Sequence, residues 1–174
     1  MKKLLFLLIS VLFLGSCATI YRDSEGNIVS KEKMEQLKKA AVYGHLDDQR
    51  YRIFVDKIHP MGYPTRTLTS DYVVEVSGDS IGLSLPYMGK VYRAPIDGII
   101  DWQFIAPINF YSWSKIKNGA QITITTQHEN ESLEIQLDIY DNAKAYINIK
   151  SNFKSAIGYS GEMQLNDKFI PHRK

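Results

Sequence analysis

The chain has 174 residues, of which 44% are hydrophobic and 23% charged, and its formal net charge is +2 at pH 7. This length supports one domain with its own core, and the balanced charge argues against a nucleic-acid-binding protein, which would need a concentrated basic face. There is one cysteine, so no disulfide can form within the chain.

The first sixteen residues have the pattern of a bacterial lipoprotein signal peptide. Two lysines at positions 2–3 precede an apolar run over residues 4–14, and small residues at 15–16 stand before Cys17. The run is too short for a transmembrane helix, which needs about 20 apolar residues, but it fits the apolar region of a signal peptide. We expect cleavage before Cys17 and acylation of this residue with diacylglycerol and a third chain such as palmitate. In the alternative, an ordinary secretory signal, Cys17 is incidental.

A small neutral residue, Ala18, follows the cysteine, which predicts sorting to the outer membrane. The expected localisation is therefore the bacterial cell envelope, with a lipid anchor in the outer membrane and the protein facing the periplasm. Residues 17–29 are predicted to be the lipidated cysteine and a flexible polar tether. Cleavage removes two lysines, which leaves 19 of the 21 Lys and Arg against 19 Asp and Glu, and a net charge of zero.

One helix is predicted, from Ser30 to about Leu46. Ser30 is a suitable N-cap, Glu32 suits the first turn, and Gly44 is expected to end or cap the helix. The helix is expected to lie over one end or edge of a sheet, in preference to binding a partner. Its predicted apolar face consists of Met34, Leu37 and Ala41.

From Arg50 onward the apolar residues alternate with polar ones, which predicts about eight to ten antiparallel strands. Turn sequences such as Gly78-Asp79 and Asn118-Gly119 separate the alternating runs, as expected of hairpins. The predicted fold is mostly β, with residues 30–174 forming one antiparallel meander curled into a small barrel or sandwich and preceded by one helix. Residues 97–114 are less regular, and we expect a rim, a bulge or a lid there.

Several short motifs resemble one family. They are Gly78-Asp79-Ser80, Leu85-Pro86-Tyr87-Met88-Gly89, Ala94-Pro95, Ser151-Asn152 and Ile157-Gly158-Tyr159-Ser160-Gly161. In this combination, over about residues 29–163, the chain resembles the bacterial envelope proteins of domain of unknown function 4251. Met88 replaces a usual aromatic residue, and Lys90 an expected arginine. The resemblance implies an envelope location and a one-domain β fold, and it implies no activity.

No catalytic or metal-binding motif is visible. The serines near glycines do not lie in a Gly-x-Ser-x-Gly sequence, as a hydrolase nucleophile would. The histidines lack the short spacing of metal ligands, and they are His45, His59, His128 and His172. We expect neither enzyme activity nor a metal or other cofactor.

The corner around Pro86 and Gly89 is the best candidate for a binding site. Proline interrupts the strand and glycine allows a tight reversal, so the side chains there are redirected from the sheet. If these side chains meet other aromatic residues at one end of the sheet, they form an apolar mouth with polar tips. The predicted ligand-binding residues are Tyr87, Met88, Tyr92, Arg93, Trp102 and Trp113. The simpler alternative, which we favour, is that proline and glycine fix a corner while the aromatic rings close the core.

The sequence therefore favours a non-catalytic, lipid-anchored envelope protein. Its β domain is expected to bind an apolar or glycan ligand or an envelope partner. One alternative is a scaffold that captures a partner strand on an exposed sheet edge. A hydrolase acting on an envelope polymer is a further alternative, and no spacing in the chain predicts its acid and base.

Overall fold

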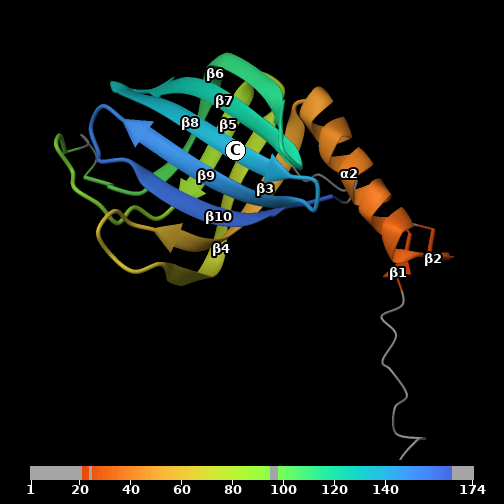
Figure 1. Ribbon diagram of the computed structural model, residues 1–174. Helices are drawn as coiled ribbons and strands as arrows, with labels where there is room; N and C mark the ends of the chain where they lie inside the picture. Colours follow the sequence, from red (N-terminus) through yellow and green to blue (C-terminus); the bar gives the residue numbers. More distant parts are fainter. Residues whose placement is uncertain (1–20, 24, 95–97, 166–174) are drawn as a thin grey trace, which may run out of the picture. The chain divides into compact units, whose positions relative to one another are not determined.

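The computed structural model describes residues 21–23, 25–94 and 98–165 (Figure 1). Cys17 and the expected signal peptide lie outside these residues. The chain divides into two units, residues 1–34 and 35–174. In the first, β1 (Tyr21–Arg22) and β2 (Ile28–Val29) pair as a short antiparallel hairpin within the segment expected to be a tether.

The second unit contains a closed antiparallel β-barrel of eight strands in the order β10-β3-β4-β5-β6-β7-β8-β9. The pairing of β10 with β3 closes it. The prediction of a mostly β fold with one helix is confirmed, and the choice between barrel and sandwich is settled as a barrel. The strands are β3 (Arg50–His59), β4 (Arg66–Ser77), β5 (Ser80–Leu85), β6 (Trp102–Ile116), β7 (Gly119–His128), β8 (Glu131–Tyr140), β9 (Lys144–Ser151) and β10 (Ile157–Met163).

Alternation along the strands places apolar side chains inside the barrel. In β8, the odd-numbered residues from Leu133 to Ile139 are buried, while Glu134 faces outward. The same alternation on the other strands gives one continuous core, in which the rings of Tyr51, Trp102 and Tyr159 are fully buried. Because this unit has its own core and a closed hydrogen-bonded ladder, it meets the requirements of a domain that folds by itself.

The barrel has two different ends because consecutive strands run in opposite directions. The β3–β4, β5–β6, β7–β8 and β9–β10 connections lie at one end, which we call the loop end. The β4–β5, β6–β7 and β8–β9 turns lie at the other end, which we call the helix end. There the hydroxyl of Tyr43 in α2 (Lys31–Asp47) donates to the Gly119 carbonyl oxygen at 3.2 Å and lies 3.3 Å from Asp141 Oδ1.

Helix α2 begins where the sequence predicts, because the Ser30 hydroxyl caps it by accepting from the Lys33 amide at 3.2 Å. Its end at Asp47 also agrees with the predicted end at about Leu46, but the predicted role of Gly44 and the predicted apolar face are wrong. The helix continues through Gly44, and its buried side chains are Val42 and Leu46, whereas Leu37 is 37% exposed. Packing on the barrel thus involves the C-terminal part of the helix. Within the described ranges, no helix is long and apolar enough to cross a membrane.

The expectation of irregular structure over residues 97–114 is wrong from Trp102 onward, because β6 is one long strand. It pairs with β5 up to Pro107 and with β7 from Ile108. A register shift follows between Ile108 and Phe110, so the expected bulge is present. Proline is tolerated because it stands where the pairing with β5 ends.

Candidate functional site

An open groove lies at the loop end, between the β3–β4 and β5–β6 connections. Its cavity volume is about 480 Å³, within the range of about 300–1,000 Å³ that is usual for small-molecule sites. The lining residues are Pro60, Met61, Tyr63, Arg66, Met88, Gly89, Lys90, Tyr92 and Ser155. We call this feature the loop-end groove.

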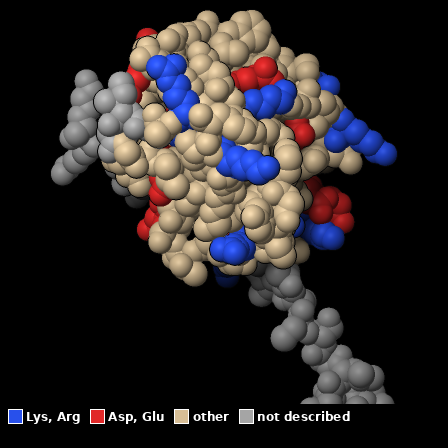
Figure 2. Space-filling model, turned by 90° about the vertical axis from the view of Figure 1, so that its left-hand side faces the viewer, with Lys and Arg blue, Asp and Glu red and all other residues tan. Residues whose placement is uncertain are grey.

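The groove combines exposed apolar side chains with positive charge. Met61, Tyr63 and Tyr92 are 72%, 69% and 68% exposed. Arg66 and Lys90 line it, and no Asp or Glu is found among its described lining residues. The loop end faces the viewer in Figure 2, where Lys and Arg side chains, some with Asp or Glu beside them, stand on a largely uncharged surface. A ligand that suits this groove has an apolar or ring-shaped body and an acidic group.

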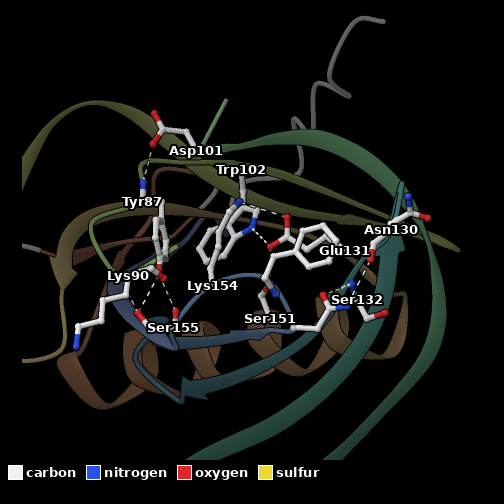
Figure 3. A network of polar contacts seen from close by, with 12 residues as sticks. Tyr87, Lys90, Asp101, Trp102, Asn130, Glu131, Ser132, Ser151, Lys154 and Ser155 are labelled. Carbon is white, nitrogen blue, oxygen red and sulfur yellow. Dashed lines mark hydrogen bonds and ion pairs between the residues drawn. The ribbon is translucent and has the colours of Figure 1, made fainter. Parts of the chain in front are cut away.

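A hydrogen-bond network centred on Tyr87 (Figure 3) adjoins the groove, because its members Lys90 and Ser155 line the groove. The Tyr87 hydroxyl lies 2.8 Å from the Lys90 carbonyl oxygen and 2.9 Å from the Ser155 hydroxyl. The Lys90 amide donates to Ser155 Oγ at 3.1 Å, and the Tyr87 amide donates to Asp101 at 2.8 Å. Burial raises the pKa of the Tyr87 hydroxyl. This hydroxyl therefore serves as a neutral clamp between two loops.

Gly89 is required by the close packing of this clamp. A Cβ atom at this position would lie 2.4 Å from the Tyr87 hydroxyl oxygen and 2.8 Å from Ser155 Oγ. Any side chain would therefore push the tyrosine out of its hydrogen bonds. The corner motif of the sequence is explained by this contact.

A buried ion pair lies next to the clamp. Lys154 is 2% exposed, and its Nζ lies 3.3 Å from Glu131 Oε2 and 4.8 Å from the centre of the Trp102 ring. The other oxygen, Glu131 Oε1, accepts from Ser151 Oγ at 2.5 Å and from Trp102 Nε1 at 3.3 Å. Buried charges of this kind persist only when their hydrogen bonds are satisfied, as they are here. The pair thus joins the first residues of β6 and β8 and the last residue of β9 to the β9–β10 connection.

A second, smaller pocket of about 70 Å³ is lined by Trp102. Arg93, Glu131 and Lys154 contribute to its lining, together with Phe104 and His128, whose rings stack at 4.3 Å. Because charges of both signs line this pocket and its volume is small, it fits a ligand less well than the groove does.

Five of the six predicted ligand-binding residues lie at the loop end, in different roles. Met88 and Tyr92 line the groove, and Arg93 and Trp102 line the smaller pocket. Tyr87 and Trp102 are 4% and 1% exposed, and their rings meet edge to face at 5.1 Å, as the structural alternative expects.

Trp113 does not join this group, which corrects the predicted set. Its ring packs 5.9 Å from that of Tyr43, at the helix end of the barrel. The reason is that β6 is continuous, so its first and last residues lie at opposite ends.

The sequence interpretation missed several residues of the loop end. Glu131 could have been found, because it lies in phase with Leu133 and Ile135 and so points into the barrel. Lys154 and Ser155 follow no periodic pattern, and Arg66 belongs to an exposed stretch of β4. Their roles come from contacts between loops.

A serine–histidine contact lies at the end of β3, directly before the connection that borders the groove. His59 Nε2 is 2.9 Å from Ser160 Oγ, and His59 Nδ1 is 2.9 Å from Thr65 Oγ1. The third group is thus a hydroxyl rather than the carboxylate of a hydrolase triad. The hydrogen bond between His59 and Thr65 joins the two ends of the connection that carries Tyr63. Among the described residues, no group of three or more His, Cys, Asp or Glu side chains is arranged to hold a metal ion.

Three of the motifs that suggested a family meet in this network, namely those that contain Pro86, Asn152 and Tyr159, whereas Gly78-Asp79-Ser80 lies at the β4–β5 turn of the helix end. Tyr159 donates to the Pro86 carbonyl oxygen at 2.7 Å, and Asn152 Oδ1 accepts from the Ser132 amide at 2.9 Å. The family model described as domain of unknown function DUF4251 matches residues 32–163. No curated protein matches.

A crystal structure of a DUF4251 family protein from Bacteroides eggerthii has a similar fold. The TM-score is 0.62 at 18% identity, and the similarity covers 78% of this chain and 92% of that one. At this identity the likeness concerns the fold alone. The family match extends over most of the chain, and the protein is therefore a member of the DUF4251 family.

Proposed function

We propose that this protein is a lipid-anchored component of the bacterial envelope that binds an amphipathic acid in its loop-end groove, without catalysis. The observation that carries the proposal is the combination of exposed Tyr63 and Tyr92 with Arg66 and Lys90 in one groove. Aromatic faces pack on apolar or ring-shaped bodies, and the two cations attract an acidic group.

The position of the groove on a fixed base supports binding. Tyr87 and Ser155 hold the Lys90 backbone, and the buried Glu131–Lys154 pair fixes the loops below it. Preorganised loops lose little conformational freedom when a ligand binds, which favours affinity.

The anchor is proposed from the sequence pattern that ends at Cys17. Acylation there would hold the protein at the membrane, and Ala18 favours the outer membrane, with the barrel in the periplasm. Two or more acyl chains anchor a protein stably, whereas one chain binds reversibly.

The alternatives receive less support. A strand-capturing scaffold needs an open sheet edge, and the eight described strands of the barrel close on themselves. A hydrolase needs an oriented base beside a nucleophile in a cleft, whereas the His59–Ser160 contact is oriented by a threonine.

The proposal is tested with anilinonaphthalene sulfonate, a fluorescent probe that combines aromatic rings with an anionic group. Residues 18–174 are titrated with the probe, and its fluorescence is followed. We expect Tyr92→Ala to weaken binding by about two- to tenfold through loss of ring contacts, and Lys90→Gln by about two- to fivefold.

The matched control is Phe110→Ala, which removes an aromatic ring that is 52% exposed and lies outside the groove lining. It should leave the affinity unchanged. Equal losses in Phe110→Ala and Tyr92→Ala would show that the probe reads general surface hydrophobicity, and the groove would not be the binding site.

A further inference from the structure

We infer that the loop end of the barrel docks on an anionic lipid surface, with the loop-end groove at the centre of the contact. The inference deepens the proposed function, because it rests on the same groove and names the source of the amphipathic acid: the phospholipid headgroup and the upper part of its acyl chains.

The first observation is a set of exposed apolar side chains carried by the two connections that border the groove. Met61 and Tyr63 belong to the β3–β4 connection, and Tyr92 belongs to the β5–β6 connection. In the same connection, Ile99 is 51% exposed and Ile100 46% exposed. Scattered single apolar residues are ordinary on a surface, but a group on adjacent loops at one end indicates an interaction site.

The second observation is the charge on the same segments. Arg66, Lys90 and Arg93 are all exposed and lie at the borders of the two connections. Arg93 lies over the Phe153 ring, at 4.8 Å from its centre. Basic side chains beside apolar and aromatic ones are the composition of surfaces that bind anionic membranes.

The acidic groups of the loop end are placed differently. Asp101 accepts from the Tyr87 amide, and Glu131 is 7% exposed and paired with Lys154. Glu129 belongs to the β7–β8 turn and lines the smaller pocket rather than the groove. The described lining of the groove therefore carries the cations Arg66 and Lys90 and no carboxylate.

A lipid surface explains more of these residues than a soluble sugar does. A sugar in the groove would use Tyr63 and Tyr92, and would leave Ile99 and Ile100, which lie outside the groove lining, in water. The interface of a bilayer accepts aromatic rings at the headgroup level and aliphatic side chains just below. Helix α2 packs at the helix end through Tyr43, and no helix of the described residues lies over the loop end (Figure 1).

The test uses residues 18–174, which lack the lipid anchor and retain the barrel. The protein is mixed with vesicles of equal parts phosphatidylglycerol and phosphatidylcholine, or of phosphatidylcholine alone, and the bound fraction is measured by flotation. We expect binding to the anionic vesicles only, and release at high salt, because the attraction between exposed charges is screened.

Two variants with matched controls locate the contact. Lys90→Gln should weaken vesicle binding by about fivefold, as expected for one cation near an anionic surface, whereas Lys144→Gln at the helix end should have no effect. Tyr92→Ala should weaken binding and Phe110→Ala should not. Far-UV circular dichroism of each variant confirms that the barrel is folded.

Two results would overturn the inference. One is equal binding to both kinds of vesicle. The other is no binding to anionic vesicles by protein that still binds anilinonaphthalene sulfonate in the groove. The latter result would leave the proposed function standing with a soluble ligand. If the protein bound neither the anionic vesicles nor anilinonaphthalene sulfonate, the groove would not be a binding site for either.

Discussion

The hydroxyl groups of Tyr87 and Ser155 lie 2.9 Å apart, although 68 residues separate them in the chain. This contact joins the β5–β6 connection to the β9–β10 connection and holds the backbone of Lys90 between them. The backbone beside the groove is thus held by a buried tyrosine, as expected from the favoured interpretation of the sequence, in which the aromatic rings close the core.

Gly89→Ala is expected to destabilise the protein by about 1–3 kcal/mol, because the new methyl group overlaps the Tyr87 hydroxyl and Ser155 Oγ. Urea unfolding followed by circular dichroism measures the change. The control is Gly44→Ala in α2, where a Cβ meets nothing within 4 Å. It should stabilise the helix by up to about 1 kcal/mol. An unchanged free energy of unfolding in Gly89→Ala would show that the Tyr87 side chain can move aside without loss of stability.

Glu131→Gln is expected to lower the free energy of unfolding by about 3–5 kcal/mol, because it leaves the Lys154 ammonium buried without its counter-charge. Lys154→Met should lower the free energy of unfolding by a similar amount, because it leaves the Glu131 carboxylate buried without its counter-charge. The double variant should lose less than the sum of the two, since neither charge then remains. Strict additivity in urea unfolding would contradict the account of a coupled buried pair.

The protein is expected to lose stability above about pH 10, the ordinary pKa of tyrosine. Burial raises the pKa of Tyr51, Tyr111 and Tyr159 in the folded state. Below pH 10 these hydroxyls are neutral in both states, and their contribution is complete. Above pH 10 the tyrosine hydroxyls ionise in the unfolded chain before they do so in the folded protein. The free energy of unfolding therefore falls by up to about 1.4 kcal/mol per pH unit for each tyrosine.

Tyr51→Phe tests this mechanism, because Tyr51 is fully buried and its hydroxyl lies 3.4 Å from that of Tyr111. Urea midpoints measured between neutral and strongly alkaline pH should fall less steeply in the variant. An unchanged slope would assign the alkaline loss to other groups.

The fold was predictable because its determinants are local. Alternating residues such as Leu133 and Ile135, together with hairpin turns at Gly78 and Asn118, specify antiparallel strands, and both turn residues have positive φ. The sequence left barrel and sandwich equally open, because closure depends on the pairing of β10 with β3, which are distant in the chain.

The site was predictable only in part. Its corner was visible from Pro86 and Gly89, which interrupt a strand pattern. The separation of Trp113 from Trp102 was not visible, because Pro107 suggested a break where β6 continues. The positions of Lys154 and Arg66 depend on contacts between loops, and the alternation of apolar and polar residues does not reveal such contacts.

Cys17→Ala tests the proposed anchor. In a bacterial host supplied with labelled palmitate, the unaltered protein should incorporate the label and fractionate with membranes, and the variant should not incorporate it. Label in the variant, or an unlabelled unaltered protein, would contradict acylation at this residue.

Methionine methyl NMR shows whether a ligand binds in the loop-end groove. Residues 18–174 contain four methionines: Met34 in α2, Met61 and Met88 in the groove, and Met163, which is 2% exposed. Titration with anilinonaphthalene sulfonate should shift the Met61 and Met88 signals and leave those of Met34 and Met163 in place. Shifts confined to Met34 or Met163, or no shift at saturating probe, would contradict binding in this groove.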